Sequence, residues 1–166
     1  PFTYNALRYS SGHRDCPDHD MLMPVLNRTT WHALGDSIAA LGVCLYRPFS
    51  RGRVSLTRRG RDLGPDIDFR FFDDPCDLAR MIDGYRRVHR YMEAAREHLP
   101  GLEVFAPTSM RLVAKLSEPG MVNAAIGALL AGAFDAPDPI RRLALGRAGV
   151  DPAPLLADDE ALAQFV

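Results

Sequence analysis

The chain has 166 residues, of which 47% are hydrophobic and 25% are charged, so it holds enough apolar material for one domain with its own core. Its formal net charge of −1 excludes a strong overall field that would attract nucleic acid or an anionic membrane. The three cysteines are scattered without a CxxC pair and no apolar leader opens the sequence, so we expect a cytoplasmic protein with no disulfide scaffold and no membrane span.

Strand patterns dominate the first half of the sequence. Residues 1–20 are polar and are interrupted by glycine and proline, which is typical of a connecting segment. The apolar run Met21–Leu26 predicts a strand, and Pro24 within it favours an edge strand or a bulge. After a loop over residues 27–37, apolar or alternating residues predict further strands at 38–46, 52–58 and 67–71. Strands this close in sequence favour an antiparallel sheet, because parallel neighbours need long crossover connections.

Helical patterns dominate the second half. The clearest one predicts a helix from Pro75 to about His98, with Asp74 as its cap, Pro75 in the first helical position and Asp77 where a capping-box acid would lie. Apolar residues at helical spacing follow along one side of it. Four more helices are expected, at residues 109–116, 120–133 and 139–146 and from about residue 158. The very apolar stretch 121–134 is too short to span a bilayer, and we expect it to be a buried helix.

Three consecutive motifs resemble a known family. The strings RPFSRGRVSL (residues 47–56), PDIDFRFF (65–72) and DDPCDLARMIDGYRRV (73–88) are similar to the C-terminal region of the glucose–methanol–choline (GMC) family of flavin-dependent oxidoreductases. The flanking strings RYSSG, DMLM and WHALG resemble the bacterial choline and alcohol dehydrogenase-like branch of this family. The resemblance extends over nearly the whole chain, and it is the combination of the motifs in this order that makes it specific.

The resemblance implies an α+β fold in which an antiparallel sheet of about four to six strands is flanked by helices. It implies that residues 1–166 form a single partial domain, the substrate-binding region, and that an FAD-binding domain of the same parent protein is its partner. In such an enzyme a small alcohol passes a hydride to FAD while a histidine takes the hydroxyl proton. That histidine belongs to an HPxGT-like segment, which we expect beyond Val166. We therefore assign no catalytic, cofactor-binding or metal-binding residue, and we expect this stretch to be inactive alone.

The resemblance also suggests where the substrate lies. The strand with Met21 and Met23 and the loop with Trp31 and His32 correspond to the part of the substrate domain that approaches the substrate side of the flavin. Met21 and Met23 point to the same face of a strand and would form an adaptable apolar wall. We therefore predict these four residues as substrate-binding. The alternative, ordinary packing in the core, is open for each of them.

Two other functions compete with this interpretation. The same fold could serve as a stand-alone, non-catalytic module that binds a ligand or assembles with other chains, and such a module should have a closed, polar surface. His13, Cys16 and His19 are spaced like zinc ligands. No second pair of ligands accompanies them, so we favour a polar loop over a metal site.

Overall fold

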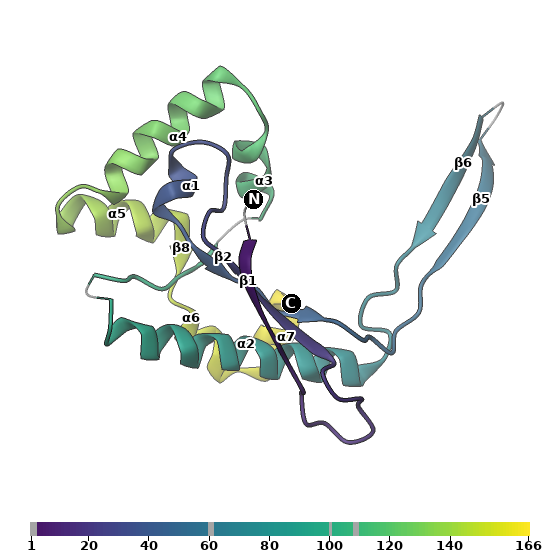
Figure 1. The fold of residues 1–166 in the computed structure, drawn as a ribbon. Coiled ribbons are helices and arrows are strands. Elements are labelled where there is room, and N and C mark those ends of the chain that lie inside the picture. Colours follow the sequence, from purple (N-terminus) through teal and green to yellow (C-terminus); the bar gives the residue numbers. More distant parts are fainter. Residues whose placement is uncertain (1–2, 60–61, 100, 108–109) are drawn as a thin grey trace.

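The computed structural model describes residues 3–59, 62–99, 101–107 and 110–166, and it is a mixed α+β structure (Figure 1). Within these ranges every strand pairing is antiparallel, and seven helices surround the strands. The predicted fold class is therefore confirmed. The strands do not form one sheet, however, since they divide into a four-stranded sheet and two separate two-stranded pairs.

The four-stranded sheet is built around β2 (Met21–Leu26), the strand predicted from its apolar run. One edge of β2 pairs with β1 (Thr3–Tyr9), while β3 (Ala40–Leu41) and β4 (Cys44–Leu45) share its other edge. The prediction of a connecting segment over the first twenty residues is thus wrong for β1. Its side chains from residue 5 to residue 8 are exposed, and it is held by backbone pairing, so its composition gives no apolar signal.

Pro24 lies in the central strand of this sheet rather than at an edge. Its carbonyl accepts a hydrogen bond from the Gly42 amide at 3.0 Å, so its backbone faces the edge that β3 and β4 share. Gly42 lies between these two short strands, where the ladder is interrupted. Because neither β3 nor β4 pairs with Pro24 on that edge, the amide hydrogen that proline lacks is not needed there.

Strands β5 (Arg53–Arg59) and β6 (Asp62–Asp68) form a long hairpin that projects from the rest of the molecule (Figure 1). Its first strand confirms the prediction for residues 52–58. The prediction for residues 67–71 fails beyond Asp68, because Arg70 and Phe72 have positive φ angles of 46° and 62°. A bulky residue in that region cannot continue a strand, so the chain turns there toward the long helix.

Helix α2 (Pro75–Arg96) is the longest element and lies across the four-stranded sheet (Figure 1). The Asp74 carboxylate accepts the Cys76 amide at 2.9 Å, which confirms the predicted cap, and Pro75 lies in the first turn. The short helices α6 (Pro152–Ala157) and α7 (Asp159–Phe165) pack against α2. The fully buried side chains Met21, Met23 and Leu162 mark the core around this helix.

A second group of helices lies at the other end of the sheet. It contains α1 (Leu34–Ser37), α3 (Met110–Ser117), α4 (Met121–Phe134) and α5 (Asp138–Ala148), and the β7 (Ala106–Pro107) and β8 (Gly149–Val150) pair lies beside it. Ser109, the predicted first residue of α3, lies outside the described residues. No helix in the described ranges is both long and apolar enough to cross a membrane.

The expectation that residues 121–134 form a buried helix is wrong. Helix α4 buries only Gly127 and Ala131, while Met121 is 90% exposed and Leu129 is 77% exposed. Its apolar residues surround the whole helix, but α1, α3 and α5 cover only part of it. Exposed apolar surface of this kind is typical of interaction sites.

Candidate functional site

Met21 and Met23 both point into the core, as their spacing on β2 requires. Helix α2 approaches this face closely at Gly84. A Cβ atom on Gly84 would lie 2.4 Å from Val43 Cγ1 and 3.5 Å from Met21 Cε, so only glycine permits this packing. The structure therefore places the two methionines between the sheet and α2. Their predicted contact with substrate stays a prediction.

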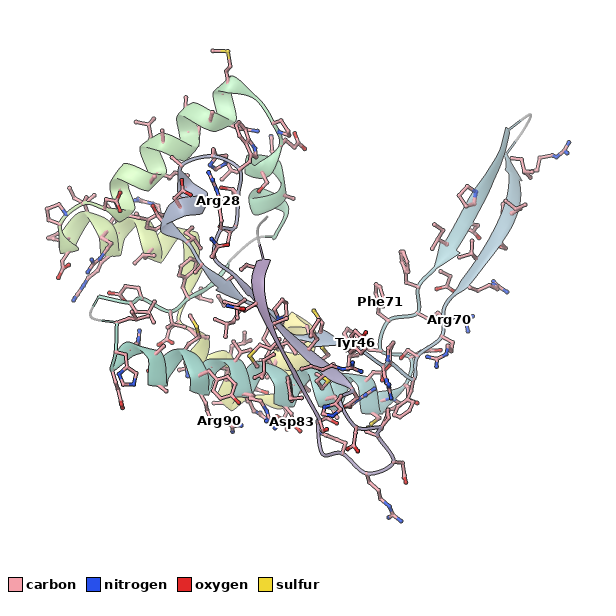
Figure 2. All side chains as sticks on the ribbon, viewed as in Figure 1. Arg28, Tyr46, Arg70, Phe71, Asp83 and Arg90 are labelled. Atoms are coloured by element: carbon pink, nitrogen blue, oxygen red, sulfur yellow. The ribbon has the colours of Figure 1, made fainter. Side chains whose placement is uncertain are left out.

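The loop that carries Trp31 and His32 is fixed by Arg28 (Figure 2). The Arg28 side chain donates to the carbonyls of Thr30 and Trp31, both at 2.9 Å, and its Nε lies 3.2 Å from an Asp36 carboxylate oxygen. Gly35 then lies so close to the loop that a Cβ atom there would be 2.2 Å from the Thr30 carbonyl oxygen. The WHALG residues thus form a tight loop around the guanidinium of Arg28.

Both aromatic side chains of this loop bind the C-terminal end of α3. His32 Nε2 donates to the Leu116 carbonyl at 2.9 Å, and Trp31 Nε1 donates to the Ser117 carbonyl at 2.9 Å. The last carbonyls of a helix have no partner within the helix, so these two N–H groups satisfy them. His32 is only 4% exposed and packs against Gly127 of α4, where a Cβ atom would lie 2.3 Å from its Nδ1. Trp31 keeps 39% of its surface open.

A cluster of three buried charged side chains was not predicted. Asp20, Asp77 and Arg80 are all fully buried. Arg80 Nη1 donates to Asp20 Oδ2 at 2.7 Å, and Arg80 Nη2 donates to Asp77 Oδ1. The guanidinium also donates to the Arg47 carbonyl at 3.2 Å from both Nη atoms, and it lies 4.8 Å from the centre of the Phe49 ring.

The two carboxylates of this cluster also bind backbone amides. Asp77 accepts the amides of Phe49 and Ser50 at 3.0 and 2.8 Å, and Asp20 accepts the amide and the hydroxyl of Ser11, both at 2.7 Å. Burial alone would raise the pKa of Asp77, but these amides and Arg80 outweigh it and lower its pKa to about 2. The pKa of Asp20 is lowered in the same way, because the bonds from Arg80 and Ser11 outweigh burial.

The charged cluster explains the spacing of the motifs. It joins the residue before β2, the Pro48–Phe49–Ser50 turn and the first two turns of α2, and so fixes the point from which the hairpin leaves the body. The capping-box role predicted for Asp77 is wrong, since its side chain binds Phe49, Ser50 and Arg80 instead. One signal was present in the sequence: Asp77, Arg80 and Gly84 recur at helical spacing on the face of α2 that is buried.

The loop over residues 10–20 folds back onto α2. His13 Nε2 lies 2.5 Å from Asp83 Oδ2, and the Sγ atoms of Cys16 and Cys76 are 3.5 Å apart. Burial and the Cys16 contact raise the pKa of the Cys76 thiol. In the part of the chain that the structure describes, no three His, Cys, Asp or Glu side chains converge on a possible metal position.

The hairpin has two chemically different faces. The cross-strand pairs Val54–Ile67 and Leu56–Pro65 lie on one face, whereas Arg53–Asp68 and Ser55–Asp66 lie on the other. Leu56 is 71% exposed, and Val54 and Ile67 are also exposed, so the apolar face lies bare. Phe71 lies at the root of the hairpin (Figure 2), and its ring stacks on that of Phe69 with centroids 5.0 Å apart.

A cavity of about 280 Å³ lies at the C-terminal end of α2, beside the β7–β8 pair. Its charged lining consists of Glu93, Glu103, Asp151 and Arg96, and Arg96 already contacts both glutamates, at 3.1 and 3.9 Å. Acidic side chains disfavour the diphosphate of a dinucleotide. The sequence also has no glycine-rich phosphate-binding loop. The described residues that line this cavity therefore do not fit FAD, and we derive no chemical step through it.

Comparison with known proteins gives one match. The family model described as GMC oxidoreductase matches residues 48–130, which is half of the chain. The matched segment contains the hairpin, α2 with Asp77 and Arg80, and most of α4. No curated protein and no solved structure matches the chain.

Proposed function

Because the chain belongs to the GMC oxidoreductase family, we propose that it forms the substrate-binding portion of an FAD-dependent alcohol dehydrogenase or oxidase of the choline-like branch. In such an enzyme the hydride of a small alcohol passes to the flavin, which a separate FAD-binding domain of the parent protein would hold. This stretch would then contribute part of the surface that binds and orients the alcohol. We propose no proton-accepting residue within it.

The bare apolar face of the hairpin is the observation that carries this proposal. An isolated two-stranded hairpin is at best marginally stable in water, and this one receives little packing from the other described elements. Its exposed apolar residues need a partner surface, and the family match over residues 48–130 supports a parent protein with an FAD-binding domain. We propose that the FAD-binding domain packs against this face. The stand-alone module would instead require a closed, polar surface.

The four residues predicted to bind substrate differ in how exposed they are. Trp31 is the one that presents open surface, while Met21, Met23 and His32 are buried. His32 has both ring nitrogens engaged, with Thr30 Oγ1 at 3.2 Å and Leu116 O at 2.9 Å, so it would position the loop rather than accept a proton from the alcohol. We propose that Trp31 contacts the alcohol.

The test uses the full-length parent protein, which includes the FAD-binding domain, under anaerobic conditions. Choline and simple primary alcohols are added in turn, and reduction is followed through the visible absorption of the flavin. We expect at least one alcohol to bleach the flavin, and reoxidation by oxygen then separates an oxidase from a dehydrogenase. A full-length parent protein that purifies without flavin, or whose flavin no alcohol reduces, would overturn the proposal.

A further inference from the structure

Two of the three cysteines meet, although they are 60 positions apart in the sequence. Cys16 lies in the loop over residues 10–20, and Cys76 lies in the first turn of α2. Their Sγ atoms are 3.5 Å apart, whereas a disulfide bond requires about 2.0 Å. A combined shift of about 1.5 Å, within reach of a partly exposed loop, would therefore bring them to bonding distance.

We propose that Cys16 and Cys76 form an oxidisable dithiol, which a low-molecular-weight disulfide such as oxidised glutathione converts into an intramolecular disulfide. The bond would tie the loop over residues 10–20 to the N-terminal end of α2. It would thereby reinforce the charged cluster from which the hairpin leaves the body.

The surroundings of the two thiols already hold them together. On the loop side, His13 binds Asp83 of α2 at 2.5 Å, and Asp20 accepts a hydrogen bond from Arg80 of α2 at 2.7 Å. On the helix side, the Cys76 amide is fixed by the Asp74 cap at 2.9 Å. Because the loop is attached to α2 on both sides of Cys16, each thiol has the other at a high effective concentration.

The reaction balances as two thiol–disulfide exchanges. The thiolate of one cysteine attacks a sulfur atom of oxidised glutathione, which forms a mixed disulfide and releases one glutathione thiolate. The thiolate of the second cysteine then attacks the protein sulfur of the mixed disulfide, so the Cys16–Cys76 bond forms and the second glutathione leaves. The two protons of the cysteine thiols pass to the released glutathione thiolates, and two electrons move from the protein to the oxidant.

The chain offers its own control in Cys44. This residue lies on β4 and is exposed, so its reactivity reports how well the oxidant reaches an ordinary surface thiol. A reaction governed by access alone would modify Cys44 first. A reaction governed by proximity would instead join Cys16 to Cys76 and leave Cys44 with at most a glutathione adduct.

The experiment compares the protein with its Cys16→Ser, Cys76→Ser and Cys44→Ser variants in oxidised and reduced glutathione. Remaining thiols are alkylated, and intact mass and peptide mapping then identify the crosslink. We expect both the unsubstituted protein and the Cys44→Ser variant to lose two hydrogen atoms on oxidation. Each should yield a peptide in which Cys16 is joined to Cys76. The crosslink should also raise the thermal midpoint by about 5 °C or more, and a reductant should reverse this rise.

The Cys16→Ser and Cys76→Ser variants should each lose the crosslink and the rise in the thermal midpoint. Each should keep the circular dichroism spectrum of the unsubstituted protein. Serine nearly matches cysteine in size, so both variants should fold. The inference is overturned if Cys16 and Cys76 remain alkylatable in excess oxidant, or if they carry only separate glutathione adducts. A crosslink that involves Cys44 would overturn it as well.

Discussion

Replacement of Arg80 by methionine should be among the most destabilising single changes in this chain. Methionine keeps much of the side-chain length but leaves the carboxylates of Asp20 and Asp77 buried without their guanidinium partner. Removing one partner of a buried ion pair costs about 3–5 kcal/mol. Each kcal/mol lowers the thermal midpoint of a domain of this size by about 2–4 °C. We therefore expect the midpoint to fall by about 6–20 °C.

Arg90→Met is the matched control, since Arg90 lies on the same helix and is exposed (Figure 2). It should change the free energy of unfolding by no more than about 0.5 kcal/mol. Both variants are followed by circular dichroism during heating and in urea at neutral pH. The reasoning is refuted if Arg80→Met unfolds within about 2 °C of Arg90→Met.

Two further predictions concern two buried contacts in different parts of the fold. The pKa of Asp77 is about 2 in the folded chain against 3.8 in the unfolded one, so its carboxylate contributes about 2 kcal/mol of stability above pH 4, which is lost as the pH falls toward 2. Urea unfolding between pH 2 and 6 should show this loss, and a slope that is the same in Asp77→Asn would contradict it. Gly127→Ala should destabilise by about 1–3 kcal/mol, because the new methyl group would overlap His32. Gly132→Ala on the same helix has open space and should be neutral or slightly stabilising, so equal midpoints for the two variants would refute the His32 packing.

The elements that the sequence predicted well are those whose signals are local. The limits of α2 follow from a cap, a proline in the first turn and apolar residues at helical spacing, all within the helix itself. The two chemically different faces of β5 follow from alternation along one strand. Strand β1 gave no such signal, since its edge position leaves polar and apolar residues equally exposed.

The burial of side chains and their hydrogen-bond and ion-pair partners were harder to predict, because both depend on residues far apart in the sequence. The composition of α4 indicates an apolar helix but not which neighbours cover it, and most of its surface is bare. Arg80 meets Asp20 across 60 positions, and His32 meets the Leu116 carbonyl across 84. No spacing rule joins such pairs, so the charged cluster and the role of His32 became visible only in the structure.

The most direct test concerns the partner of the hairpin, and it uses two neighbouring residues on opposite faces of β5. Leu56→Arg places a charge on the apolar face, whereas Thr57→Arg places the same charge on the polar face. Bound flavin and the rate of alcohol-driven flavin reduction are measured for both variants of the flavin-containing protein. We expect Leu56→Arg to lose most of its flavin or its activity and Thr57→Arg to retain both. Equal flavin content and equal rates in the two variants would contradict the proposal that the FAD-binding domain covers this face.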